Sequence, residues 1–106
     1  MMISPNRFKG KIIVMTGATA GIGFDAARIF GLEGGTVIIS SRKQKKVDAA
    51  LKKLKSLNIN CYGMVCHVAK KKHRHRFLKF IDDKFGTIDV LSWNAGIGFY
   101  AGCYHD

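Results

Sequence analysis

With 106 residues, 47% of them hydrophobic, the chain has the composition of one small globular domain, residues 1–106, and not of a disordered segment. Its formal net charge of +11 points to an anionic partner or to a basic surface in contact with solvent. No apolar stretch approaches the roughly 20 residues that span a bilayer, and nothing before the first apolar run has the apolar core of a secretion signal.

The cysteines and histidines argue against disulfides and metal. Three cysteines, an odd number without a CxxC pair, are typical of reduced thiols in an intracellular protein. The pairs Cys66–His67 and Cys103–His105 match no zinc-ligand spacing, so no metal site is predicted.

The first predicted unit is a strand, a glycine-rich turn and a helix. The apolar run at 12–15 is typical of a buried parallel strand, and apolar residues at helical spacing predict a helix over 22–33. Between them, Gly17 allows a tight turn, Gly21 leaves room for a pyrophosphate, and Gly23 lets helix and strand pack closely. A helix that begins there offers free N–H groups to phosphates. The predicted phosphate-binding residues are Gly17, Thr19, Ala20, Gly21, Ile22 and Gly23.

The rest of the chain continues the alternation. Apolar patterning predicts a strand at 36–40, a helix at 43–57, a strand at 62–66, a helix from the basic tract 70–76 to Gly86, and a strand at 88–93. The order βαβαβαβ predicts an α/β fold: a Rossmann-like parallel sheet with strand order 3-2-1-4 and helices on both faces, truncated after the fourth strand. In such a sheet a ligand binds at the carboxyl ends of the strands, between strands 1 and 4.

The end of the second strand indicates the nucleotide. An NAD site usually has a carboxylate there to accept from the ribose 2′-OH. This chain has Ser41, Arg42 and Lys43 instead. Because a guanidinium donates two parallel hydrogen bonds to a phosphate, Arg42 favours a 2′-phosphate and thus NADP(H), with Ser41 and Lys43 in support.

The glycine motif 16–23, the segment 40–44, the segment 65–68 and Asn94–Gly96 together resemble the short-chain dehydrogenase/reductase family. The second and third segments resemble its NADPH-dependent carbonyl reductase branch, which includes peroxisomal retinol-reducing enzymes. The resemblance implies hydride transfer between NADP(H) and a carbonyl or alcohol. It also implies further cofactor contacts, which come from His67, Val68, Asn94, Ala95 and Gly96.

The catalytic residues of that family have no counterpart here. The family uses a Tyr and a Lys spaced Y-x-x-x-K, with a Ser and an Asn, beyond the Asn-Ala-Gly segment. None of Tyr62, Tyr100 and Tyr104 has a Lys four residues on. We therefore assign no catalytic residue and expect the cofactor-binding half of such an enzyme. The sequence does not indicate the substrate.

A sheet that ends at the fourth strand would have an apolar edge there. We therefore expect the chain to be marginally stable, to self-associate or to pair with a full-length relative. The chain could instead be a non-catalytic nucleotide-binding or interaction module. The tract 70–76 could bind nucleic acid or direct nuclear import, although such tracts more often lie solvated at a helix start.

The sequence also gives an expectation of location. The absence of a secretion signal and the reduced cysteines favour an intracellular, cytoplasmic protein. The last three residues, 104–106, are not the tripeptide of a peroxisomal address, and mitochondrial and nuclear locations stay open.

Overall fold

The computed structural model describes residues 6–17, 21–67, 70–93 and 100–101. Its elements in chain order are β1 (Ile12–Thr16), α1 (Gly21–Leu32), β2 (Thr36–Ser41), α2 (Gln44–Ser56), β3 (Cys61–Val65), α3 (Lys71–Phe85), β4 (Val90–Trp93) and β5 (Tyr100–Ala101). This alternation confirms the α/β class. No helix in the described part of the chain is long and apolar enough to cross a bilayer.

A single sheet runs through the described residues in the order β3-β2-β1-β4-β5. The strands β1 to β4 are parallel, which confirms the predicted Rossmann-like order 3-2-1-4. The short strand β5 was not predicted. It pairs antiparallel with the last two residues of β4, so β4 is not a fully open edge.

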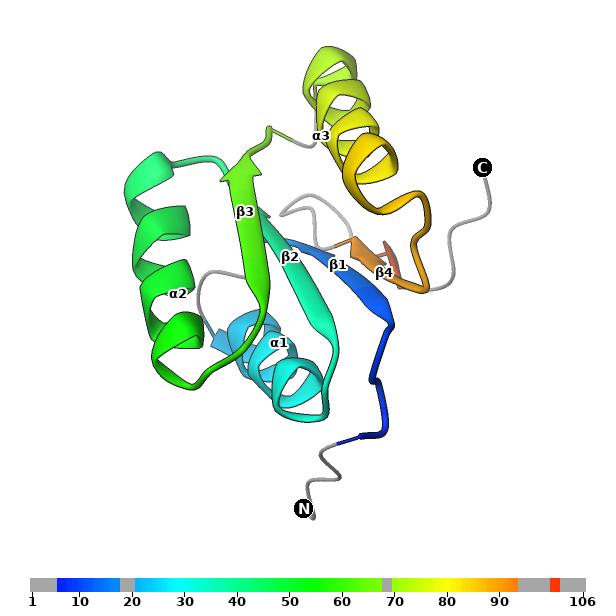
Figure 1. The fold of residues 1–106 in the computed structure, drawn as a ribbon. Coiled ribbons are helices and arrows are strands. Elements are labelled where there is room, and N and C mark those ends of the chain that lie inside the picture. The colour runs from blue at the N-terminus through cyan, green and yellow to red at the C-terminus, as the bar shows by residue number, and fades with distance from the viewer. Residues whose placement is uncertain (1–5, 18–20, 68–69, 94–99, 102–106) are drawn as a thin grey trace.

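The helices cover both faces of the sheet, as expected. Figure 1 shows α1 and α2 on one side and α3 on the other. All five residues of β1 are buried, because neighbouring strands and both helical layers surround this strand. The crossover connections therefore place the third helix opposite the first two.

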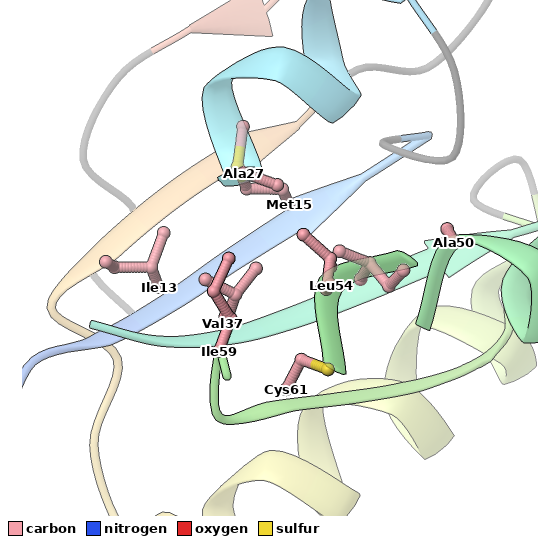
Figure 2. Close-up of a cluster of buried hydrophobic side chains, with 9 residues drawn as sticks. Ile13, Met15, Ala27, Val37, Ala50, Leu54, Ile59 and Cys61 are labelled. Carbon is pink, nitrogen blue, oxygen red and sulfur yellow. The ribbon is translucent and has the colours of Figure 1, made fainter. Parts of the chain in front are cut away.

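Side chains alternate between the two faces along each strand. The cluster facing α1 and α2, shown in Figure 2, consists of Ile13, Met15, Ala27, Val37, Ile39, Ala50, Leu54, Ile59 and Cys61. The cluster facing α3 consists of Ile12, Val14, Ile38, Cys66, Phe77, Ile81 and Leu91. The strands β1 and β2 thus contribute buried side chains to both cores.

The basic tract 70–76 supplies the first turns of a helix, because α3 begins at Lys71. In β4, Leu91 is 5% exposed and belongs to the cluster that faces α3.

Candidate dinucleotide site

The carboxyl ends of the central strands lie level with one another. Thr16, the last residue of β1, pairs with Ser40 on one side and with Trp93 on the other. The Thr16 hydroxyl also donates to the carbonyl of Ser92 at 3.4 Å. The glycine turn after β1 and the segment after β4 therefore start side by side, as the predicted crevice requires.

The glycine turn has the backbone that its sequence predicts. Gly17 and Gly21 have φ angles of 67° and 64°, in the left-handed region that glycine enters without strain. The Gly17 N–H donates to the carbonyl of Ser40 at 2.9 Å, which fixes the turn to the neighbouring strand. A Cβ built on Gly21 meets no atom of the described residues within 4 Å, so they leave the space beside Gly21 open.

Helix α1 begins at this open space. Gly21, Ile22 and Gly23 form the start of its main chain, and its first turn contains no acidic residue. The free N–H groups and the positive dipole end of α1 therefore face the turn without a competing carboxylate from that first turn. Thr19 and Ala20 lie outside the described residues.

The segment after β2 is cationic and exposed. β2 ends at Ser41, Arg42 follows, and Lys43 caps α2 with an extended backbone and no side-chain cap. The Ser41 hydroxyl oxygen accepts from the Lys43 N–H at 3.5 Å. Arg42 and Lys43 are exposed and make no ion pair with the described residues. Their charges are thus available to a ligand at this edge.

The end of β3 adjoins that segment. The Cys66 N–H donates to the Ser41 carbonyl at 2.9 Å, so His67 follows directly beside Arg42 at the same sheet edge. His67 is partly buried, and its main-chain N–H donates to Nδ1 of His73 at 3.2 Å. Sequence reasoning missed His73, because nothing distinguishes it from the other basic residues of the tract.

The remaining predicted contacts lie outside the described residues: Val68, Asn94, Ala95 and Gly96. Gly17 is hydrogen-bonded to Ser40 and Cys66 to Ser41, so the segments that hold the glycine turn, Arg42 and His67 start at the same end of the sheet.

Positive charge concentrates in the stretch from the end of β2 to the first turns of α3. Residues 42–76 hold 12 of the 18 lysines and arginines and one of the seven acids. The lysines of α2 are exposed. The N-terminus of α3 carries Lys70, Lys71 and Lys72 without an acidic residue in its first turn. An anion approaching these strand ends is therefore attracted by several cations at once.

A separate hollow of about 520 Å³ lies away from these strand ends. Its lining comes from α3 and from the connection to β4: His75, Leu78, Lys79, Asp82, Gly86, Thr87 and Ile88. None of the predicted site residues that the structure describes lines it, which places this hollow apart from the glycine turn and from Ser41, Arg42, Lys43 and His67.

The family profile described as short chain dehydrogenase matches residues 11–104. The chain belongs to the short-chain dehydrogenase/reductase family. This confirms the resemblance that the glycine motif and the segments after the second and third strands carry. The match includes every strand and helix of the described fold.

Two curated relatives and one solved structure illustrate the similarity. Short-chain dehydrogenase/reductase SDRA of Arabidopsis thaliana is 47% identical over 86% of this chain and 36% of its own length. Human dehydrogenase/reductase SDR family member 4 is 38% identical over 91% of this chain and 34% of its own length. L-sorbose reductase from Gluconobacter frateurii, solved with NADPH and L-sorbose, aligns with a TM-score of 0.81 at 27% identity, over 89% of this chain and 36% of that one.

The chain spans about a third of the length of the curated relatives it matches. It corresponds to the N-terminal, cofactor-binding region of the family.

Proposed function

We propose that this chain binds NADP(H) as the cofactor-binding part of an oxidoreductase that transfers hydride between NADP(H) and a carbonyl or alcohol. The observation that carries the proposal is the cationic end of β2. There Arg42 and Lys43 are exposed and unpaired among the described residues, and no carboxylate follows the strand to accept from a ribose 2′-OH. The presence of NADPH in the related L-sorbose reductase structure supports this choice.

The residues present suit a pyrophosphate. The open space at Gly21 leaves room for phosphate oxygens, and a Cβ there would occupy part of that room. The N-terminus of α1 supplies N–H donors and the positive end of the helix dipole. These features would hold the diphosphate against the end of β1.

The residues after β2 and β3 suit the adenosine end. Arg42 would donate to the 2′-phosphate through its planar guanidinium, with the Ser41 hydroxyl and the Lys43 ammonium as further donors. His67 lies next to this segment in the fold, because the N–H of the preceding residue, Cys66, donates a hydrogen bond to the carbonyl of Ser41. His67 would border the adenine.

Bound NADP(H) supplies or accepts the hydride, and this chain's own residues bind and orient it. The proton donor toward the carbonyl oxygen is proposed to belong to the remaining part of the enzyme, because this chain matches only about a third of the length of each relative. The substrate specificity belongs there too.

The test is a calorimetric titration of the 106-residue chain with NADPH and then NADH. We expect saturable binding with NADPH preferred. Replacement of Arg42 by alanine should weaken NADPH binding by roughly 10- to 100-fold, as for loss of a charged hydrogen bond, and should leave NADH binding unchanged. The variant Lys45→Ala removes an equal charge from the exposed face of α2 and is the matched control.

Two results would contradict the proposal. Equal affinity for NADPH and NADH would remove the role of the 2′-phosphate. An equal loss for Arg42→Ala and Lys45→Ala would reduce Arg42 to a general charge effect.

A further inference from the structure

The side chain of His73 holds the main chain at the end of β3. His73 is the third residue of α3, and its Nδ1 accepts a hydrogen bond from the His67 N–H at 3.2 Å. The two imidazole rings also meet edge to face, with centroids 5.0 Å apart. The Lys70 N–H donates to the His67 carbonyl at 2.8 Å and closes the same connection. His67 is thus fixed at its N–H, its carbonyl and its ring.

A second donor points at the same nitrogen. The Arg76 guanidinium, one turn further along α3, lies 3.4 Å from Nδ1 of His73. An amide N–H and a guanidinium can only donate, so Nδ1 must present its lone pair and the ring proton must sit on Nε2. The contact therefore requires the neutral form of His73.

The surroundings favour that neutral form. The pKa of His73 is lowered by desolvation first and then by the nearby basic groups of Arg76, His67 and Lys70. Arg76 and His73 belong to α3, whereas His67 and Lys70 belong to the connection from β3. Buried Cys66, at the start of that connection, keeps its proton because burial raises its pKa. Among the described residues no carboxylate forms an ion pair with His73.

We propose that His73 is a positioning residue, which in its neutral form holds His67 in place beside the adenosine end of the bound dinucleotide. This rests on the proposed NADP(H) binding. Protonation would convert Nδ1 into a donor facing two other donors, and the connection would lose its anchor. His73 acts through His67 and touches no reacting atom.

The pH dependence has a definite sign. Because the pKa of His73 is lower in the folded chain than its ordinary value of 6.5, the folded state binds fewer protons than the unfolded one. The stabilisation from the His67–His73 bond is therefore complete above that ordinary value. It is lost as the pH falls through the folded-state pKa.

The first test needs no cofactor. In the ¹⁵N-labelled chain, the amide signal of His67 should shift with the titration of the His73 ring, with a midpoint below 6.5. The variant His73→Phe, which has a ring without an acceptor, should abolish that step. The variant His75→Phe should keep it, because His75 is exposed and its side chain makes no hydrogen bond with the described residues.

The second test measures NADPH binding at pH 7.5. Loss of one hydrogen bond corresponds to about a fivefold weaker affinity, which we expect for His73→Phe. His73→Gln, whose amide oxygen can accept the same bond, should recover most of the loss, and His75→Phe should bind like the wild type. Should His73→Phe not fold, the wild-type amide titration and the His73→Gln affinity decide between the outcomes.

Three results overturn the proposal. One is a His67 amide signal that ignores the His73 titration. Another is an unchanged NADPH affinity in folded His73→Phe. A wild-type chain that binds neither NADPH nor NADH overturns the proposed function and with it this role, even when the amide titration shows that the hydrogen bond exists.

Discussion

Asp89 and Ile12 are joined by two hydrogen bonds at the point where β4 approaches β1. The Asp89 carboxylate accepts from the Ile12 N–H at 2.8 Å, and the Asp89 N–H donates to the Ile12 carbonyl at 2.9 Å. These residues are 77 positions apart in the sequence. The pair therefore fixes the register between the last parallel strand and the central one.

Asp89→Ala should lower the free energy of unfolding by about 1 to 2 kcal/mol, because the partly buried Ile12 N–H loses its charged acceptor. Urea denaturation followed by circular dichroism measures the change. Asp83→Ala is the control, since its bond to Lys79 joins two exposed side chains and contributes at most about 0.5 kcal/mol. An equal loss in the free energy of unfolding for the two variants would show that the hydrogen bond to Ile12 contributes no more than a surface ion pair.

The N-terminus of α3 lacks a stabilising side-chain cap. Its capping residue, Lys70, has an extended backbone with φ −99° and ψ 120° but makes no side-chain cap. Lys70→Ser should raise the free energy of unfolding by about 1 kcal/mol, because the hydroxyl can accept from a free N–H of the first turn and a cation leaves the positive end of the helix dipole. Thermal melting measures the gain, and Lys53→Ser inside α2 should instead be neutral or destabilising.

Much of this fold was predictable, because short-range signals agree with long-range packing. The apolar run of β1 and the helical spacing of α1 and α2 each specify an element, and the βαβ connections then leave few topologies. The glycine turn was equally readable, because the positive φ of Gly17 and Gly21 suits glycine above other residues.

Other features depend on contacts that sequence alone does not display. The start of α3 within the basic tract at Lys71 depends on such contacts, because a run of cations is an unfavourable helix N-terminus and the packing of Phe77 and Ile81 on the sheet outweighs that cost. His73 was missed because its role arises from its distance to the His67 amide, which no local pattern records.

The buried thiols of Cys61 and Cys66 should react slowly in the folded chain. Burial raises both pKa values above the ordinary 9.0, although nearby cations partly oppose the shift. Because the thiolate is the reactive form, alkylation by iodoacetamide at pH 8 should be at least about tenfold slower in the folded chain than in urea. Peptide mass spectrometry resolves the two sites, and equal rates in both conditions would contradict their burial.

The same shifts set a stability trend at high pH. Between the unfolded-state and folded-state pKa values the folded chain binds more thiol protons than the unfolded one, so the free energy of unfolding falls as the pH rises above about 9. The variant Cys66→Ala should reduce this slope. Urea titrations at pH 8 and at higher pH measure it, and a slope that Cys66→Ala leaves unaltered would assign the trend to other groups.

Gly21 and Gly10 allow strain and ligand binding to be separated. Both have a positive φ, 64° and 79°, and a Cβ added to either meets no atom within 4 Å in the part of the chain that the structure describes. Alanine at either position should therefore cost a similar 1 kcal/mol or so of stability through backbone strain alone. Gly21 borders the proposed diphosphate position and Gly10 lies before β1, so only Gly21→Ala should also weaken NADPH binding, by more than its loss of stability explains. Parallel urea and NADPH titrations of the two variants check this, and an equal loss of affinity in both would place the diphosphate elsewhere.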